Sequence, residues 1–384
     1  MRVLLLSPFA PHLRHDHAAS DTIVQLVPRL AAEVELFVYS PQTGPEPVTA
    51  AELGCTLLPS SAAAHAGIAA RLGAKPAWLR QAWPRQATRD VRELVERLRP
   101  DVVHAEYLQC AEAIEGLPNA VLGIHDVTEN VMRQSLKASS FPKKPYRLAE
   151  LARTAAFERA AIRNAAAVLT LSDADFAVAS RFNSNVVLAR PGIELGDRQW
   201  AQPAPGARPV FVFAGAMWRR ANALIAHFLV RDVMPRVWQR FPDAELRIVG
   251  ARPPQDVVEL AGADARVVVT GEVPDIRDEM LRSHAVLAPS IVGGGVLMKV
   301  VHAMALGCPV ITSTEPAASV QGDMSTLFVA DGEESLAVAA CQVLGDPAHA
   351  AARGRNGRLH VGRLFQWDNT VRAYLDAYKI ASRG

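Results

Sequence analysis

The residues with the clearest potential for chemistry are three consecutive glycines, Gly293, Gly294 and Gly295, and two side chains that follow them, Lys299 and His302. An apolar run that predicts a strand precedes the glycines, and the segment after them predicts a helix. Backbone N–H groups at such a turn are free to bind a phosphate, and the helix dipole favours its negative charge. Lys299 and His302 are three residues apart, so they share one helix face. The pattern predicts a phosphate site, but a tight turn beside a solvated Lys299 explains the spacing equally well.

Histidines and a carboxylate in the first half of the sequence are further candidates. His15 and His17 flank an aspartate and have the spacing of a metal-binding pair. No third ligand follows at a recognisable spacing, so we predict no metal site and a polar loop on the acceptor side. His104 and Glu106 end an apolar run, where both can contact an acceptor. For His104 a core histidine with satisfied ring nitrogens is the better interpretation.

Asp173 and Asp175 have the spacing of a metal-binding DxD motif. Ser172 precedes them directly after an apolar run, which is the position of a helix N-cap with Asp175 at the third helical residue. We therefore predict helix capping at this motif and no metal binding.

Two series of strands are expected to position these residues. Short apolar runs alternate with segments of helical spacing, such as Val91, Leu94 and Leu98, and this alternation predicts parallel sheets covered on both faces. Ligands bind at the carboxyl ends of the strands in such sheets. The first series comprises residues 3–7, 34–40, 101–106, 120–126 and 166–172, and the second comprises 209–215, 244–250, 265–271, 284–290 and 308–314.

A stretch rich in proline and glycine separates the two series and predicts a linker. We therefore expect an N-terminal, acceptor-side Rossmann-like domain over 1–190, a linker over 191–208 and a C-terminal Rossmann-like domain over 209–365 that binds the nucleotide. The two α/β domains are expected to face each other across a cleft. The last amphipathic segment, 366–384, is expected to cross back as a helix that packs on the N-terminal domain.

Composition restricts the class of function. The chain has 384 residues, and this length favours two domains. Half of the residues are hydrophobic, as is usual for a globular protein. Its formal net charge of +2 gives no electrostatic case for nucleic acid binding. The four cysteines are scattered and lack zinc-ligand spacing, which fits a reduced, cytoplasmic compartment. The N-terminal apolar run is too short for a signal peptide, and no stretch approaches the ~20 apolar residues of a membrane span.

One stretch, GGGVLMKVVHAMALGCPVITST (293–314), resembles the donor-site signature of glycosyltransferase family 4. In that family a glycine-rich turn, a Lys, a Glu and an AMA-x-G-x-PV run build the nucleotide-sugar site. Further similarities follow in the family's order: HDVTENVMRQ (125–134) to its H-[ND]-V-E-S segment, LARPGI (188–193) to its linker motif, FPDAELRIVG (241–250) to a strand of its second domain, and FQWDNTVRAYLDAY (365–378) to its C-terminal helix.

The resemblance implies a GT-B fold and a retaining, metal-independent transfer of a sugar of the hexosyl type. The nucleotide-sugar is then a substrate, and no cofactor is implied. By position, Lys299 matches the Lys that binds the diphosphate, and His125 matches the His that faces the donor sugar. We accordingly expect both residues to be catalytic.

Some positions differ from the family pattern. His302 stands where the family has a ribose-binding Glu, and a neutral imidazole offers only one acceptor nitrogen. After Gly215, the family's Arg and Lys give way to Ala and to Asn222. Arg219 and Arg220 lie between these positions and are expected to replace them in donor binding. In the first domain, HDHAAS replaces the family's glycine-rich loop and hinders close approach of a ligand to the backbone.

The leading hypothesis is therefore a cytoplasmic, retaining glycosyltransferase of bacterial-type carbohydrate biosynthesis, with a small-molecule, glycan or lipid-linked acceptor. Two alternatives remain open: a nucleotide-sugar epimerase of the same fold, and a catalytically degenerate homologue that binds a sugar nucleotide or a partner protein. A basic stretch over 137–163 fits either peripheral contact with anionic lipids or a solvated helix face. Whether the donor carries UDP, GDP or dTDP is undetermined by the sequence.

Overall fold

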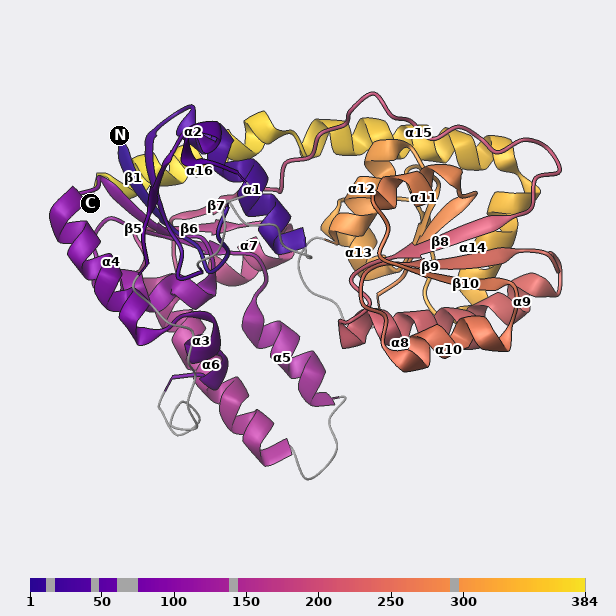
Figure 1. Cartoon of the computed structure of the whole chain (residues 1–384), viewed down its shortest axis with the longest axis horizontal. Helices are drawn as coiled ribbons and strands as arrows, with labels where there is room; N and C mark the ends of the chain where they lie inside the picture. The colour runs from indigo at the N-terminus through magenta and orange to yellow at the C-terminus, as the bar shows by residue number, and fades with distance from the viewer. Residues whose placement is uncertain (12–17, 43–47, 61–74, 138–143, 291–296, 384) are drawn as a thin grey trace. The chain divides into compact units, whose positions relative to one another are not determined.

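The chain forms two compact α/β units, each built on a parallel sheet with helices on both faces (Figure 1). Unit 1 comprises Met1–Pro191 with Asp368–Gly384, and unit 2 comprises Gly192–Trp367. The predicted fold class of two Rossmann-like parallel-sheet units is thereby confirmed. The computed structural model describes residues 1–11, 18–42, 48–60, 75–137, 144–290 and 297–383.

The sheet of unit 1 has seven strands in the order β3-β2-β1-β4-β5-β6-β7, and the paired strands run parallel. Most residues of its inner strands are buried, as a sheet covered on both faces requires. Because β4 and β5 are neighbours, the residues that follow them lie at the same edge of the sheet. The strands are β1 (Arg2–Leu6), β2 (Glu35–Tyr39), β3 (Thr56–Leu58), β4 (Val102–Ala105), β5 (Ala120–Ile124), β6 (Ala167–Thr170) and β7 (Val186–Leu188).

Side-chain caps begin two of the described helices of unit 1, at Thr49 and at Ser172. Ser172 accepts a hydrogen bond from the backbone N–H of Asp175 at the start of α7, so the predicted helix cap is confirmed. The last helix, α16, buries Tyr374 and Tyr378 completely within this unit. The helical segments are α1 (Ala18–Ala31), α2 (Ala50–Leu53), α3 (Ala77–Ala82), α4 (Arg85–Leu98), the 3₁₀ helix Leu108–Ile114, α5 (Thr128–Lys137), α6 (Lys144–Asn164), α7 (Asp173–Ala179) and α16 (Trp367–Ala381).

The sheet of unit 2 has six strands in the order β10-β9-β8-β11-β12-β13, again with parallel pairing. At the carboxyl edge the chain after β9 passes so close to the chain after β8 that only glycine fits. Gly250 has φ +149°, and a Cβ there would lie 1.7 Å from the carbonyl oxygen of Gly215. The strands are β8 (Val210–Ala214), β9 (Glu245–Val249), β10 (Val267–Gly271), β11 (Ala285–Ala288), β12 (Val310–Thr312) and β13 (Phe328–Val329).

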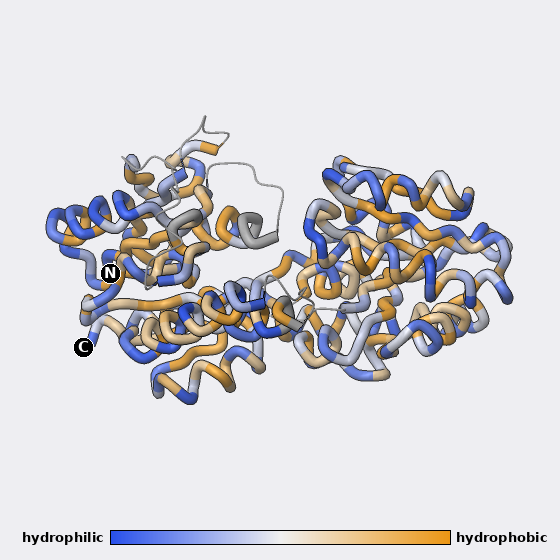
Figure 2. Tube along the Cα trace, turned by 90° about the horizontal axis from the view of Figure 1, so that it is seen from below, coloured by the Kyte–Doolittle hydropathy of each residue, from blue (hydrophilic) through white to orange (hydrophobic). Residues whose placement is uncertain are grey.

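The helices of unit 2 cover a core of apolar side chains, and in each unit the hydrophobic stretches gather in the interior (Figure 2). Gly307 ends α12 with φ +80°, a conformation that favours glycine at the end of a helix. The helical segments are α8 (Arg220–Phe228), the π-helical turn Leu229–Val233, α9 (Met234–Trp238), α10 (Gln255–Ala263), α11 (Ile276–Arg282), α12 (Met298–Leu306), α13 (Thr314–Ser319), α14 (Glu333–Gly345) and α15 (Pro347–Leu364).

Residues 192–209 contain no helix or strand and are held along unit 2 by hydrogen bonds. The backbone N–H of Trp200 donates to Leu306 over 2.7 Å, and its indole N–H donates to the carbonyl of Ser283 over 2.6 Å. None of the described helices is long and apolar enough to span a membrane.

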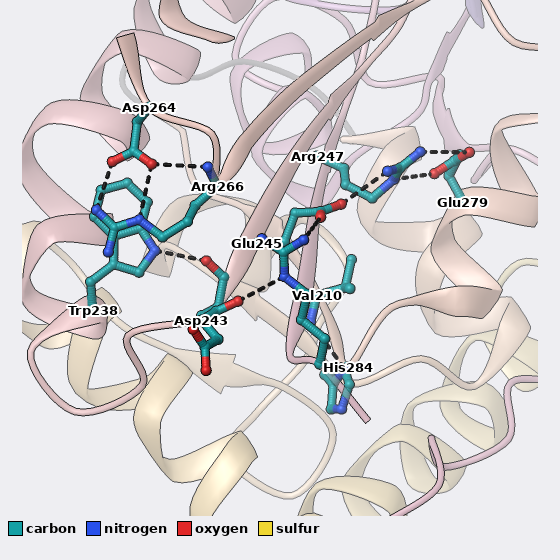
Figure 3. Close-up of polar contacts among 11 residues, drawn as sticks. Val210, Trp238, Asp243, Glu245, Arg247, Asp264, Arg266, Glu279 and His284 are labelled. Carbon is teal, nitrogen blue, oxygen red and sulfur yellow. Dashed lines mark hydrogen bonds and ion pairs between the residues drawn. The ribbon is translucent and has the colours of Figure 1, made fainter. Parts of the chain in front are cut away.

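Charged side chains on β9 and its surroundings neutralise one another (Figure 3). Arg247 donates to Glu245 over 2.9 Å and to Glu279 over 2.6 Å. Arg266 pairs with Asp264 over 2.6 Å, and its guanidinium lies 3.8 Å from the centroid of a Trp238 ring. Arg247 and Arg266 are therefore both paired with carboxylates.

Candidate functional site

Lys299 lies in the first turn of α12, after the carboxyl end of β11, and points toward the turn after β8. Its Nζ donates to Asn222 Oδ1 over 3.0 Å and lies 4.5 Å from the centroid of the Phe213 ring. Gly215 leaves the space that the amine occupies, because a Cβ there would lie 3.0 Å from Nζ and 2.8 Å from Asn222 Nδ2. The Asn222 amide also donates to the carbonyl of Ala216 over 3.0 Å. Asn222 thus makes hydrogen bonds both to the turn after β8 and to the amine of Lys299.

The surroundings of Lys299 favour an anionic ligand. Burial, together with the positive charge of Arg219, lowers the pKa of Lys299 to about 7. Within the described ranges, neither Lys299 nor Arg219 has a carboxylate partner. An anion placed beside both cations would stabilise the protonated amine and raise its pKa. The arrangement therefore has the properties of an unsatisfied anion site.

The start of α12 adds a further positive potential. Leu297 precedes the helix and provides no side-chain cap for its first N–H groups. Such N–H groups and the helix dipole attract phosphate oxygens. The predicted Gly293, Gly294 and Gly295 lie outside the described residues.

His302 follows Lys299 on the same helix and is half-buried. Burial and the nearby charge of Arg277, from α11, lower the pKa of the His302 imidazole. The ring is therefore neutral at pH 7 and above, with one donor and one acceptor nitrogen. Among the described residues it has no hydrogen-bond partner, which leaves it available to a ligand.

Arg219 and Arg220 lie at the turn between β8 and α8, as the N-cap and the first residue of that helix. Trp218 precedes them and is 46% exposed. The guanidinium of Arg252, in the loop after β9, lies 5.3 Å from the centroid of the Trp218 ring. Basic and aromatic groups thus gather at the carboxyl edge of this sheet.

In unit 1, Glu106 follows β4 and is completely buried among hydrogen-bond donors. Its Oε1 lies 2.8 Å from His125 Nε2 and accepts from the Tyr374 hydroxyl over 2.7 Å. Its Oε2 lies 3.0 Å from His104 Nε2, outside hydrogen-bond geometry. The other ring nitrogen of His104 is 2.9 Å from the hydroxyl of Tyr378. His104 is thus a fully buried core histidine, as one of its two interpretations predicted, but of its two ring nitrogens only Nδ1 has a hydrogen-bond partner among the described residues.

Glu106 remains ionised in this setting. Burial alone would raise its pKa, but the contacts with His104 and His125 outweigh burial and lower the pKa to about 2. His125 itself is only partly buried, with 15% of its side chain exposed. The Tyr107 ring stacks on its imidazole at a centroid distance of 3.9 Å. His125 therefore combines a fixed ring with access to solvent.

The backbone after His125 is anchored by two buried carboxylates from neighbouring helices. Asp175 accepts from the N–H of Val127 over 3.0 Å. Glu158 accepts from the N–H groups of Thr128 and Glu129 over 2.7 and 2.9 Å. Burial is the main cause that raises the pKa of both carboxyls, to about 7 for Glu158. These bonds cap α5 and fix the segment that carries His125.

Two further candidates from the sequence are the pair His15 and His17 and the basic stretch 137–163. His15 and His17 lie outside the described residues. In the basic stretch 137–163, Arg153 pairs with Glu150, and Arg159 pairs with Glu129. Ion pairs thus neutralise part of that stretch, while Tyr146 and Leu148 near the start of α6 are about half exposed.

Comparison with known proteins points to one family for the second half of the chain. Residues 208–346 match the family described as Glycosyl transferases group 1. The match includes β8, Lys299 and His302. No curated protein sequence matches the chain.

Several solved structures resemble nearly the whole chain. A sucrose-phosphate synthase from Thermosynechococcus elongatus superposes with a TM-score of 0.75 at 20% identity, covering 98% of both chains. The chain has the GT-B fold. HepE from Anabaena, in complex with UDP and glucose, has a TM-score of 0.66 at 16% identity over 98% of both chains. WaaG, a glycosyltransferase involved in lipopolysaccharide biosynthesis, has a TM-score of 0.65 at 16% identity and covers 94% of this chain and 95% of its own.

Sequence reasoning missed the partners that fix the two catalytic candidates. Asn222 appeared only as a departure from a family pattern, yet it binds Lys299. Tyr374 was not considered, because its contact with Glu106 joins residues 268 positions apart. The link between Glu106 and His125 was detectable, since both follow neighbouring parallel strands.

Proposed function

We propose that this protein is a glycosyltransferase that binds the diphosphate of a nucleotide-sugar on unit 2. The observation that carries the proposal is the position of Lys299. It lies beside Gly215, Asn222 and Arg219 at the carboxyl edge of a parallel sheet, in the region that matches the glycosyltransferase group. That edge is where open α/β sheets bind ligands.

The chemistry follows from charge development during transfer. As the bond between the sugar and the diphosphate breaks, negative charge grows on the leaving phosphate. Lys299, Arg219 and the start of α12 stabilise that charge, and their positions are set before the reaction. We propose that these groups make a metal unnecessary, so that transfer persists in EDTA. We further propose that the product retains the anomeric configuration of a hexosyl donor.

The proposed substrates draw on the structural neighbours. HepE structures contain UDP and UDP-glucose, which makes UDP-glucose the first donor to examine. A TarM structure contains α-GlcNAc-glycerol and UDP, which supports a sugar-containing acceptor. We propose a glycan, lipid-linked sugar or small molecule as acceptor.

A thermal-shift screen against UDP-, GDP- and dTDP-sugars tests donor binding. A ligand at about 100 times its dissociation constant stabilises a folded protein by about 2.7 kcal/mol, which is readily detected. Arg219→Ala should lose most of the shift. Arg208→Ala is the matched control, because it also removes a positive charge from unit 2 but pairs with Glu245 away from Lys299.

Turnover distinguishes the proposed activity from binding alone. The donor that binds should release its nucleoside diphosphate in the presence of a sugar acceptor, with and without EDTA. Binding without release for a broad acceptor panel would contradict transferase activity. Conversion of the donor into an isomeric sugar nucleotide without an acceptor would identify an epimerase instead.

A further inference from the structure

The buried carboxylate of Glu106 belongs to a group of residues from three parts of unit 1. Glu106 follows β4, His125 follows β5, and Tyr374 lies on α16. Oε1 lies 2.8 Å from His125 Nε2 and 2.7 Å from the Tyr374 hydroxyl. With the carboxylate completely buried, these protein groups and His104 replace the water that would otherwise solvate it.

The chemistry of the carboxylate determines where the proton of His125 resides. An ionised carboxylate only accepts hydrogen bonds, and a tyrosine hydroxyl already donates to Oε1. The short contact at Oε1 therefore requires that His125 Nε2 carries a hydrogen. In a neutral imidazole the other nitrogen, Nδ1, then has a free lone pair and can only accept.

Access to His125 is restricted but not closed. One face of the ring is covered by Tyr107, and 15% of the side chain is exposed. No described residue makes a hydrogen bond to Nδ1. Nδ1 is therefore available to accept a hydrogen bond from a ligand.

We propose that Glu106 is a positioning residue that holds His125 in the Nε2–H form, so that Nδ1 accepts a hydrogen bond from a sugar hydroxyl. This inference rests on the proposed glycosyltransferase function for the identity of the ligand. The hydroxyl belongs either to the donor sugar or to the acceptor. A ligand group that only accepts, such as a carbonyl or a carboxylate, is disfavoured at this position.

The backbone around His125 does not depend on Glu106. Asp175 and Glu158 fix the three residues that start with Val127 through their N–H groups. Replacing Glu106 should therefore alter the protonation and orientation of the ring more than the path of the chain. An effect of Glu106 on the His125 tautomer can therefore be separated from an effect on the fold.

The direct test is nuclear magnetic resonance of the ¹⁵N-labelled histidines at pH 7.5, with the His125 signals assigned from His125→Asn. The wild-type protein should show a protonated Nε2 and an unprotonated Nδ1. The opposite tautomer, or a ring with both nitrogens protonated, would overturn the proposal. This measurement requires no variant of Glu106 and no turnover, so its result stands even if the proposed function fails.

Two variants then separate positioning from packing. Glu106→Gln retains the shape, but its amide can donate, so the other tautomer should become populated. Tyr374→Phe removes the other donor to the same oxygen and should leave the tautomer unchanged. If Glu106→Gln folds and keeps the wild-type tautomer, Glu106 does not set it.

Kinetics with UDP-glucose connect the tautomer to function. Glu106→Gln should lower kcat/KM by roughly tenfold, the order expected for loss of one hydrogen bond to substrate. If kcat/KM also falls for hydrolysis of UDP-glucose without an acceptor, the hydroxyl belongs to the donor sugar. If kcat/KM falls only for transfer, the hydroxyl belongs to the acceptor. Unchanged rates in both reactions, with the tautomer altered, would overturn the role of Nδ1 in substrate binding.

Discussion

Raising the pH from 7 to 9 should weaken nucleoside-diphosphate binding by the wild-type protein. Burial and Arg219 lower the pKa of Lys299 to about 7, so the free amine loses its proton across this range. The bound diphosphate brings negative charge to Nζ and favours the protonated amine. Binding at higher pH must therefore include proton uptake, and the affinity falls as protons become scarce.

The size of the effect follows from the fraction of protonated amine. With a pKa of about 7, that fraction is about one half at pH 7 and about one hundredth at pH 9. The affinity should accordingly fall by about 50-fold, or about 2.3 kcal/mol, if the pKa of the complex exceeds 9. His302 does not contribute over this range, because its lowered pKa keeps the ring neutral.

Calorimetric titration of UDP at pH 7, 8 and 9 measures this dependence, and buffers of different ionisation enthalpy report the number of protons taken up. Lys299→Arg keeps a permanent charge and should bind with little dependence on pH. Lys299→Met should bind weakly throughout. A wild-type affinity that stays constant between pH 7 and 9, with no proton uptake, would refute both the lowered pKa and the contact with the diphosphate.

Other substitutions test Gly215, His302 and the start of α6. Gly215→Ala should weaken UDP binding at least tenfold without loss of the fold, because its Cβ meets the Lys299 amine; unchanged binding in calorimetry would place the diphosphate elsewhere. His302→Glu should preserve or strengthen binding of UDP-glucose if the side chain meets the ribose, whereas equal affinities for His302→Glu, His302→Ala and wild type would assign it to packing. A larger fraction of wild-type protein than of a Lys144→Glu variant should pellet with vesicles that contain anionic lipid. Equal fractions would argue against lipid contact at the start of α6.

The nine described strands that lie in the middle of a sheet, and the edge strand β10, could be predicted from the sequence. The inner strands are apolar runs because each sheet is covered on both faces, and all ten predicted runs coincide with strands. The short outer strands β3, β7 and β13 were not predicted. They have two or three residues each, and most of these are only half-buried or exposed, so hydrophobicity does not distinguish them from loops.

The candidate sites were predictable to a smaller extent. The motif around Lys299 correctly indicates its place at the start of a helix, but its low pKa depends on burial and on Arg219, which lies 80 positions earlier. Glu106 was expected to contact an acceptor directly. The structure buries it instead and connects it to His125 and Tyr374, because α16 packs against the end of β4. Such contacts depend on tertiary packing, which local patterns do not encode.

The central claim is that Lys299 and its neighbours bind a nucleoside diphosphate. Calorimetric titration of UDP, GDP and dTDP into wild type, Lys299→Met and Arg208→Ala at pH 7 tests it most directly. We predict that at least one of the three binds to wild type and to Arg208→Ala with similar affinity, and at least tenfold more weakly to Lys299→Met. Binding of equal strength to wild type and Lys299→Met, or no binding of any of the three to folded wild-type protein, would contradict the account.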